Sequence, residues 1–327
     1  MVRSGRTVLS SIISSQAKLH DEYGGVVPEL ASRQHVDTIL PVIDKALDSA
    51  GVALADVDGI AVTYGPGLAG ALLVGLSAAK ALALASQRPL VGINHLEAHI
   101  YAAFLEPLPP VAFPAVCLVV SGGHTDLMYM SGHGRLSLEG ETRDDAAGEV
   151  FDKLARAMHL GYPGGPLIDK LAQEGDARAF AFPRAYLEPG SFDFSFSGLK
   201  TAVLMEWAKC KEDHACLPDL CASFQAAVVE VLVDKSLALA HKRGVEQIVL
   251  GGGVAANSRL RQQLRTRAQS EGMALHIPAQ VYCTDNAAMV AAAGSYSLER
   301  GQRHSLSLNA KANLSLGGGN SASPGEA

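Results

Sequence analysis

The sequence has little of what marks several common protein classes. Of its 327 residues only 6% are aromatic, and its five cysteines form no CxxC pair. An odd number of cysteines without a CxxC pair indicates a reducing compartment with free or buried thiols. Cys210, His214, Cys216 and Cys221 cluster, but a zinc knuckle normally has shorter, paired spacings. We therefore expect a surface loop followed by a helix there.

An excess of positive charge is also absent. Lysine and arginine number 27 against 33 acidic residues, so the net charge of −6 gives no global field for nucleic acid. A nucleic-acid substrate would need a local patch or a helper protein. No apolar run is long enough to predict a membrane span, because Lys80 and several small residues interrupt the best candidate, Leu68–Ala85.

The first 18 residues contain arginine and serine but no acid, a composition with a faint likeness to a mitochondrial transit peptide. A β-strand around Arg6–Ser14 is the interpretation that we favour. We therefore expect a cytoplasmic protein, with the mitochondrial matrix as the alternative location.

Hydrophobic residues make up 48% of the chain, and strand-like and helix-like runs alternate, which predicts α/β layers with mixed sheets. The expected strands are Arg6–Ser14, Val57–Tyr64, Pro89–Asn94, Ala115–Ser121, Asp126–Ser131, Arg135–Glu139 and Gln247–Leu250. The expected helices are Gly67–Ser86, one starting at His95, Ala146–His159, Asp219–Arg243, Asn257–Ser270 and Asn286–Glu299. The proline-rich segment Glu106–Pro114 is the best domain boundary.

A strand that ends in glycine before a helix or turn recurs three times, as "TYGPG", "VSGGH" and "LGGGVAAN". Such turns bring backbone N–H groups close to phosphate, although each is also compatible with close packing alone. In the last of them, Gly252 is expected to allow close approach of a nucleotide. The spacing is not GxGxxG, so a Rossmann fold is not indicated.

Acidic residues gather near another glycine pair. Asp145, Glu149 and Asp152 lie near the start of a predicted helix, and Gly164–Gly165 is followed closely by Asp169. Solvated helix acids are the usual explanation for the first three. The glycine pair followed by Asp169 is the unusual feature of this stretch.

Two histidines suggest a metal site. His95 and His99 are four residues apart, which places them on one helix face, and Asp285 is a distant carboxylate that could join them. A zincin needs H-E-x-x-H and an inverzincin H-x-x-E-H, whereas this chain has H-L-E-A-H. The middle glutamate should point away from the histidine face, so a peptidase would lose its general base. Two core histidines would explain the pair equally well.

In order along the chain, nine segments resemble motifs of the tRNA N6-adenosine threonylcarbamoyltransferase family (TsaD, formerly O-sialoglycoprotein endopeptidase). They are "KLHDEYGGVVPELASRQHV", "GPGLAGALLVG", "NHLEAH", "VSGGHT", "DDAAGEVFDK", "YPGGP", "FSFSGLKTA", "GGGVAAN" and "CTDNAAM". The resemblance implies an actin-like/Hsp70-like ATPase (ASKHA) fold. Its two lobes have mixed sheets flanked by helices and enclose a central cleft. The first lobe would comprise residues 1–109 and 285–313, the second 110–284, and residues 314–327 a disordered tail.

The resemblance further implies transfer of a threonylcarbamoyl group from threonylcarbamoyl-AMP to N6 of adenosine 37, in tRNAs reading codons that begin with A. It places one divalent metal, iron with zinc as the alternative, on His95, His99 and Asp285. It also implies a substrate site, with His124 as a candidate to take the amine proton. The implied substrate-binding residues are Val119, Val120, Ser121, Gly122, Gly123, Asp152, Gly165, Asp169 and Asn257. The implied partners are tRNA, a paralogous ASKHA protein (TsaB) and a small ATPase (TsaE).

One departure concerns the start of the chain. The family normally opens with a strand and an acidic loop, "GIETSCDET", whereas Met1 here stands where the second strand should begin. On the sequence alone, this lowers the expected activity of the chain as given.

Three other classes compete. A metallopeptidase is disfavoured by the middle glutamate, and a non-catalytic paralogue by the presence of the histidine pair and the later motifs. A sugar or acetate kinase of the same fold would need machinery for an ATP γ-phosphate, for which no matching acid is found near the N-terminus.

Overall fold

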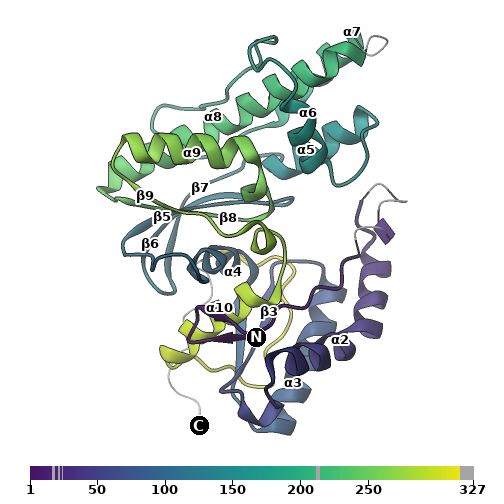
Figure 1. Ribbon diagram of the computed structural model, residues 1–327, viewed down its shortest axis with the longest axis vertical. Helices are drawn as coiled ribbons and strands as arrows, with labels where there is room; N and C mark the ends of the chain where they lie inside the picture. The colour runs from purple at the N-terminus through teal and green to yellow at the C-terminus, as the bar shows by residue number, and fades with distance from the viewer. Residues whose placement is uncertain (17–18, 21–22, 24, 211–213, 317–327) are drawn as a thin grey trace.

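An upper and a lower part make up the molecule as Figure 1 orients it, with a five-stranded sheet at the base of the upper part. This computed structural model describes residues 1–316, apart from 17–18, 21–22, 24 and 211–213. The strands are β1 (Val2–Arg3), β2 (Thr7–Val8), β3 (Ile60–Gly65), β4 (Leu90–Asn94), β5 (Ala115–Val120), β6 (Thr125–Gly132), β7 (Arg135–Glu141), β8 (Gln247–Gly251) and β9 (Ala274–His276). The α-helices are α2 (Pro28–Ala50), α3 (Ala69–Ser86), α4 (His95–Tyr101), α5 (Ala147–Ala157), α6 (Gly164–Ala172), α7 (Ser197–Cys210), α8 (Leu217–Arg243), α9 (Ser258–Ser270) and α10 (Ala287–Glu299).

The five-stranded sheet has the order β7-β6-β5-β8-β9. β5, β8 and β9 run parallel, whereas β6 and β7 form an antiparallel hairpin on the other side of β5. Every residue of β5 is fully buried, because helices cover both of its faces. Its side chains alternate between the two faces: Val120 joins the core above the sheet with α5 and α8, and Val119 joins the core below it with α4 and α10.

The lower part contains two separate two-stranded sheets. β3 and β4 pair in parallel, and β1 and β2 pair antiparallel. α2 and α3 pack against each other and α3 lies on β3, while α10 packs on α4, β3 and β1. The long helix α8, by contrast, is buried along most of its 27 residues in the upper part. The alternation of strands and helices predicted from the sequence is confirmed.

Two expectations about local structure are wrong. The strand expected at Arg6–Ser14 is only the two-residue β2, because pairing with β1 ends at Val8. The thiols of Cys210 and Cys216 were expected to be free, but they form a disulfide between the end of α7 and the start of α8. Cys117, Cys221 and Cys283 are free and buried, as expected.

The chain after α10 returns along the lower part. His304 pairs with Leu90 at the edge of β4, and Leu314 packs against Tyr64 and Leu76. The tail expected to be disordered from residue 314 is therefore ordered at Leu314, and residues 317–327 lie outside the described residues. The predicted boundaries of the two lobes stay a prediction.

One described helix, α3, is long and apolar enough to cross a membrane by length and composition. This helix packs against α2 and β3. It overlaps the span Leu68–Ala85 considered from the sequence, and both contain Lys80. The absence of a membrane association stays a prediction.

Candidate active site

His95, His99 and Asp285 converge at the junction of the two parts of the molecule. Oδ1 of Asp285 lies 3.4 Å from Nε2 of His95 and 3.3 Å from Nε2 of His99. The ligand atoms of all three lie within 4.8 Å of one another, which suits a single small cation. Two imidazoles and one carboxylate leave further coordination positions open for a substrate.

The short helix α4 presents the two imidazoles on one face. Asn94 ends β4 and caps the helix, because its Oδ1 accepts a hydrogen bond from the Leu96 N–H at 2.9 Å. A side-chain carbon on Gly251 would lie 2.6 Å from the carbonyl oxygen of His99, so glycine lets the end of β8 pack directly on α4. The position of the histidines is thus fixed by backbone packing.

The electrostatics of the cluster also suit a cation. Burial opposes ionisation of Asp285, but hydrogen bonds and charges from His95 and His99 outweigh it and hold the pKa of Asp285 below its usual value. Protein groups surround Asp285, which accounts for the desolvation, but its side chain is still 80% accessible to solvent, and water therefore screens these interactions. Nδ1 of His99 is buried and has no hydrogen-bond partner among the described residues. The three residues therefore fit a divalent metal, with an ionised carboxylate and neutral imidazole nitrogens as donors.

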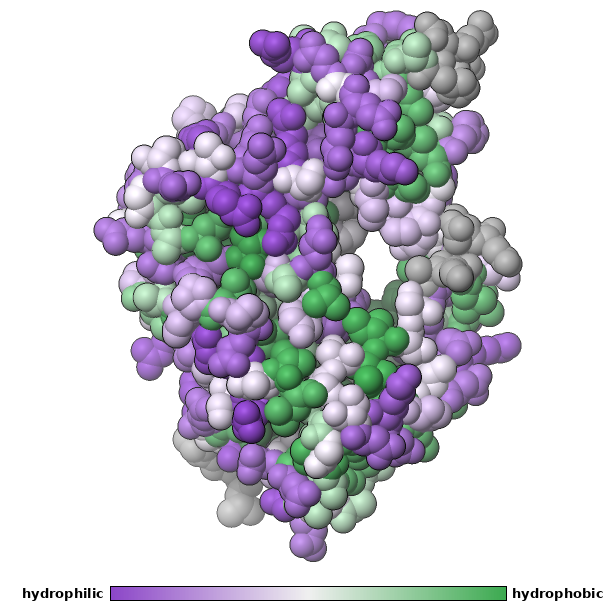
Figure 2. Space-filling model, in the orientation of Figure 1, coloured by the Kyte–Doolittle hydropathy of each residue, from purple (hydrophilic) through white to green (hydrophobic). Residues whose placement is uncertain are grey.

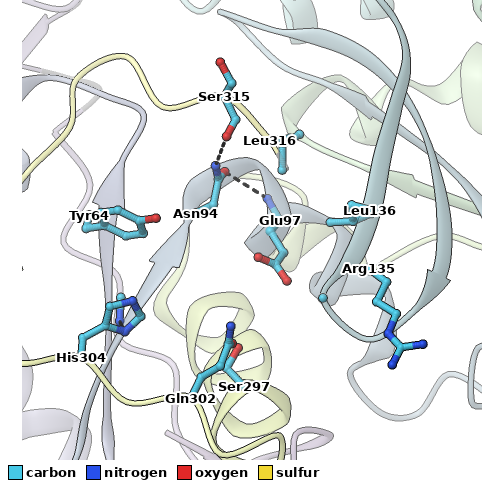
Figure 3. A pocket seen from close by; sticks show the side chains of 12 residues that line it. Tyr64, Asn94, Glu97, Arg135, Leu136, Ser297, Gln302, His304, Ser315 and Leu316 are labelled. Carbon is cyan, nitrogen blue, oxygen red and sulfur yellow. Dashed lines mark hydrogen bonds between the residues drawn. The ribbon is translucent and has the colours of Figure 1, made fainter. Parts of the chain in front are cut away.

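Glu97 points away from this face, as expected from its position between the histidines. It lines a cavity on the other side of α4 (Figure 3), with Asn94 and Tyr64 among its neighbours. Burial raises the pKa of Glu97, and the charge of Arg300 partly offsets this effect. A carboxylate on that side of the helix cannot activate a water held by the histidines, so the geometry provides no general base for a metallopeptidase there.

The turn after β5 opens beside the metal cluster. Oγ of Ser121 accepts hydrogen bonds from the N–H groups of Gly123 and His124, and the Ser121 N–H donates to the His124 carbonyl. Gly122 and Gly123 are exposed, with nothing near the position of a side chain. The pKa of His124 is lowered by burial and by the charges of His95 and His99, which favours the neutral imidazole.

Val119 and Val120, also predicted for the substrate site, lie in β5 just before this turn. Both are fully buried, and their side chains belong to the two cores on opposite faces of the sheet. Any contact with a substrate must therefore go through their backbone atoms.

The glycine turn after β8 lies next to the turn after β5, because the two strands are parallel neighbours, with Val119 opposite Gly251. Gly252 adopts a φ of +89°, and a side-chain carbon there would lie 2.3 Å from the Val120 carbonyl oxygen. Gly252 therefore serves strand packing, which explains this glycine without a nucleotide, and its expected role in nucleotide approach stays a prediction. Gly253 has open space at the same position.

Asp152 and the glycine pair form the third open turn. Oδ1 of Asp152 accepts a hydrogen bond from the Gly164 N–H at 2.7 Å, at the start of α6. Gly164 packs against the backbone of Phe151, whereas Gly165 has nothing near the position of a side chain. Burial raises the pKa of Asp152, although hydrogen bonds from Gly164 and Gly165 act in the opposite direction.

Asp169 and Asn257 belong to one polar network that joins α6, α8 and α9. Oδ1 of Asp169 accepts hydrogen bonds from Gln225 Nε2 at 3.0 Å and from Ser258 Oγ at 2.8 Å. Nδ2 of Asn257 donates to Gln225 Oε1 at 3.2 Å, and its Oδ1 caps α9 through the Leu260 N–H. Gln225 and Ser258 were not predicted, since one is buried in an apolar helix and the other directly follows the Asn257 cap.

Figure 2 shows an opening between the upper and lower parts of the molecule. The structure brings His95, His99 and Asp285 together directly. It brings the turns after β5 and β8 together through strand pairing, and Asp169 and Asn257 together through Gln225.

Comparisons with known proteins agree on one family. The family model for tRNA N6-adenosine threonylcarbamoyltransferase matches residues 7–292. A protein of that name from Symbiobacterium thermophilum is 57% identical over 318 residues, covering 97% of this chain and 93% of the relative. A protein of the same name from Trichlorobacter lovleyi is 56% identical over 321 residues, covering 97% and 92%.

The solved structures show the fold. HypF from T. kodakarensis superposes with a TM-score of 0.60 at 16% sequence identity, covering 80% of this chain and 43% of that one. At this identity the likeness concerns the architecture alone. It confirms the expected ASKHA-type α/β fold.

Proposed function

The chain belongs to the tRNA N6-adenosine threonylcarbamoyltransferase family and is a transferase, and we propose that its acyl donor is threonylcarbamoyl-AMP. The acceptor would be N6 of adenosine 37 in tRNAs reading codons that begin with A. The observation that carries this proposal is the convergence of His95, His99 and Asp285 beside the open glycine turns after β5 and β8.

A divalent metal, iron with zinc as the alternative, would be held by these three side chains. When bound, such an ion supplies Lewis-acid polarisation of a carbonyl or phosphoryl oxygen. The fit rests on the short distances from the Asp285 carboxylate to Nε2 of both histidines.

The remaining residues would bind and orient the two substrates. Gly122 and Gly123 form an exposed turn in which the Gly122 N–H can donate to a phosphate or carbamoyl oxygen, whereas the Gly123 N–H already donates to Ser121 Oγ. Asp152, Gly165, Asp169 and Asn257 would hold the adenosine part of the donor, through their own groups or through the network that contains Gln225. Positioning is the main contribution of the protein, because the mixed anhydride is already activated.

In the transfer step, the N6 amine attacks the carbamoyl carbon, the bond from that carbon to the phosphate oxygen breaks, and AMP leaves. The amine loses one proton. His124, at the end of the turn after β5, would take it, because its lowered pKa favours the neutral imidazole, which can accept a proton.

An exposed apolar face on α2 and α3 supports a protein partner. Val36 and Leu40, one turn apart on α2, are 62% and 58% exposed, and Leu73 and Leu84 on α3 are 47% and 66% exposed. α2 and α3 pack against each other, so these side chains belong to one helical layer. A paralogous ASKHA protein of the TsaB type would cover this layer, and a small ATPase of the TsaE type would act with the pair.

The tRNA would need such help, because a chain with a net charge of −6 releases few phosphate counterions by itself. A cytoplasmic location, where these partners would meet tRNA, belongs to the same proposal.

A transfer assay tests the proposal. Purified chain, donor, tRNA and the partner proteins should yield N6-threonylcarbamoyladenosine, and His95→Ala/His99→Ala should abolish it. His241→Ala is the matched control, because His241 is exposed and its Nε2 contacts only Glu271 among the described residues. Transfer by the double variant at the wild-type rate would rule out this site.

A further inference from the structure

A polar cavity lies on the side of α4 opposite the metal cluster. Its volume is about 150 Å³. Tyr64 lines it from the end of β3, Glu97 from α4, and Arg135 from the start of β7 (Figure 3). His304 and Gln302 line it from the chain that follows α10. The cavity is therefore built by segments distant in sequence that meet around one carboxyl group.

That carboxyl group lacks a partner. Oε1 of Glu97 is buried and accepts no hydrogen bond from any described residue. A buried polar atom without a partner costs about 1–3 kcal/mol, and more when it is charged. Native proteins rarely leave such an atom unsatisfied unless a water, ion or ligand serves it. Arg300, whose charge acts on Glu97, donates its Nη2 to Ser297 and Gln302 instead.

The rest of the lining offers donors and positive charge. The Gly92 N–H donates to Nδ1 of His304 at 3.1 Å, so the neutral His304 ring carries its proton on Nε2 as a further donor. The Tyr64 hydroxyl adds a donor from another wall, and Arg135 contributes an exposed guanidinium. Glu97 thus attracts a cation, and Arg135 at the rim attracts an anion.

We propose that this cavity binds a small zwitterion of the α-amino-acid class, with its ammonium group on Glu97 and its carboxylate toward Arg135. A cavity of this volume has room for several waters or for one small molecule. Convergent polar groups against the apolar side chains of Leu136 and Leu316 suit a small polar ligand. Such a ligand would contact the same turn of α4 that carries His95 and His99.

L-serine is the probe, and its binding to the metal-free chain is measured by calorimetry in the presence of a chelator, because amino acids themselves bind metal ions. We expect saturable binding. Ethanolamine lacks the carboxylate and 3-hydroxypropionate lacks the ammonium, so each should bind about tenfold more weakly or worse.

Substitutions distinguish L-serine binding in this cavity from binding at the proposed transfer site, where an analogue of the acyl donor could also bind. Glu97→Gln keeps the shape of the side chain and Arg135→Ala alters an exposed residue at the start of β7, and each should weaken L-serine binding by about tenfold. The controls are Glu174→Gln and Arg178→Ala, which lie on the exposed surface of the upper part and should bind like the wild type.

Arg135→Ala keeps the test decisive if Glu97→Gln fails to fold. The proposal is overturned if L-serine does not bind saturably, if ethanolamine binds as well as L-serine, or if the folded variants bind like their controls. Absence of binding would indicate a cavity filled by water, equal binding of ethanolamine would indicate a site for amines alone, and unchanged variants would indicate that L-serine binds elsewhere. None of them depends on tRNA or on transfer, so they leave the proposed function untouched.

Discussion

A side-chain carbon on Gly252 would lie 2.3 Å from the carbonyl oxygen of Val120. In the glycine turn after β8, Gly252 thus allows close packing on β5, whereas the next residue, Gly253, faces open space. Gly252→Ala should lower the free energy of unfolding by about 2–5 kcal/mol, because it combines an unfavourable positive φ with a backbone clash.

Gly253→Ala is the matched control, since nothing lies near its side-chain position, and its stability should change by less than about 1 kcal/mol. Urea unfolding of both variants measures the difference. Equal stability would mean that β5 and β8 are not packed as closely as the structure shows.

The second prediction concerns the metal. His99→Ala removes one of three ligands, and the metal bound after purification should fall well below one equivalent by elemental mass analysis. His241→Ala should keep the wild-type content. A folded His95→Ala/His99→Ala protein that retained a full equivalent would show that the metal binds elsewhere.

A third prediction concerns pH and stability. Burial, and then the charge of Glu141 opposite it in the sheet, raise the pKa of Asp126 from its ordinary value of 3.8 to about 7. Between about pH 4 and pH 7, the Asp126 carboxyl group therefore keeps its proton in the folded protein but loses it in the unfolded chain. The contribution of Asp126 to stability is thus fully present below about pH 4 and is lost as the pH rises toward 7.

Asp126→Asn should remove this dependence and be more stable than the wild type at about pH 8, by at most about 4 kcal/mol. Asp37→Asn, at an exposed position on α2, should leave the profile unchanged. Parallel pH profiles for the wild type and Asp126→Asn would contradict the prediction.

The fourth prediction concerns the apolar layer on α2 and α3. Val36→Glu/Leu40→Glu should abolish association with a paralogous ASKHA partner, because two charges would be buried in the interface. Its melting temperature should stay close to that of the wild type, since both side chains are exposed. Met205→Glu, 61% exposed on α7, is the control. Sedimentation of the mixed proteins measures the complex, and an undiminished complex with the double variant would place the interface elsewhere.

Much of this architecture could be predicted because strand and helix periodicities are strong where burial is one-sided or complete. β3, β4, β5 and the β6–β7 hairpin lie where the sequence indicated, and so does α8. The strand at Arg6–Ser14 was overestimated, because β propensity does not reveal where a pairing partner ends. The helices α2 and α7 were not predicted from periodicity. α2 contains Pro41, and the apolar residues of α7 are not concentrated on one face.

The site was predictable where spacing alone brings residues together, as for His95 and His99 in one helix. The participation of Asp285 came from the family resemblance, since 186 positions separate it from His99. Gln225 could not be found, because hydrogen bonding across three helices leaves no pattern in the sequence. The disulfide between Cys210 and Cys216 was missed for a related reason, as spacing does not determine cysteine pairing.

The most direct test of the central claim is the nucleoside content of tRNA in cells. Cells depleted of this protein should lose N6-threonylcarbamoyladenosine from tRNAs that read codons beginning with A, as measured by mass analysis of digested tRNA. Expression of this chain should restore the modification, and expression of its His95→Ala/His99→Ala variant should not. Unchanged modification after depletion, or rescue by the double variant equal to that by the wild type, would contradict the account.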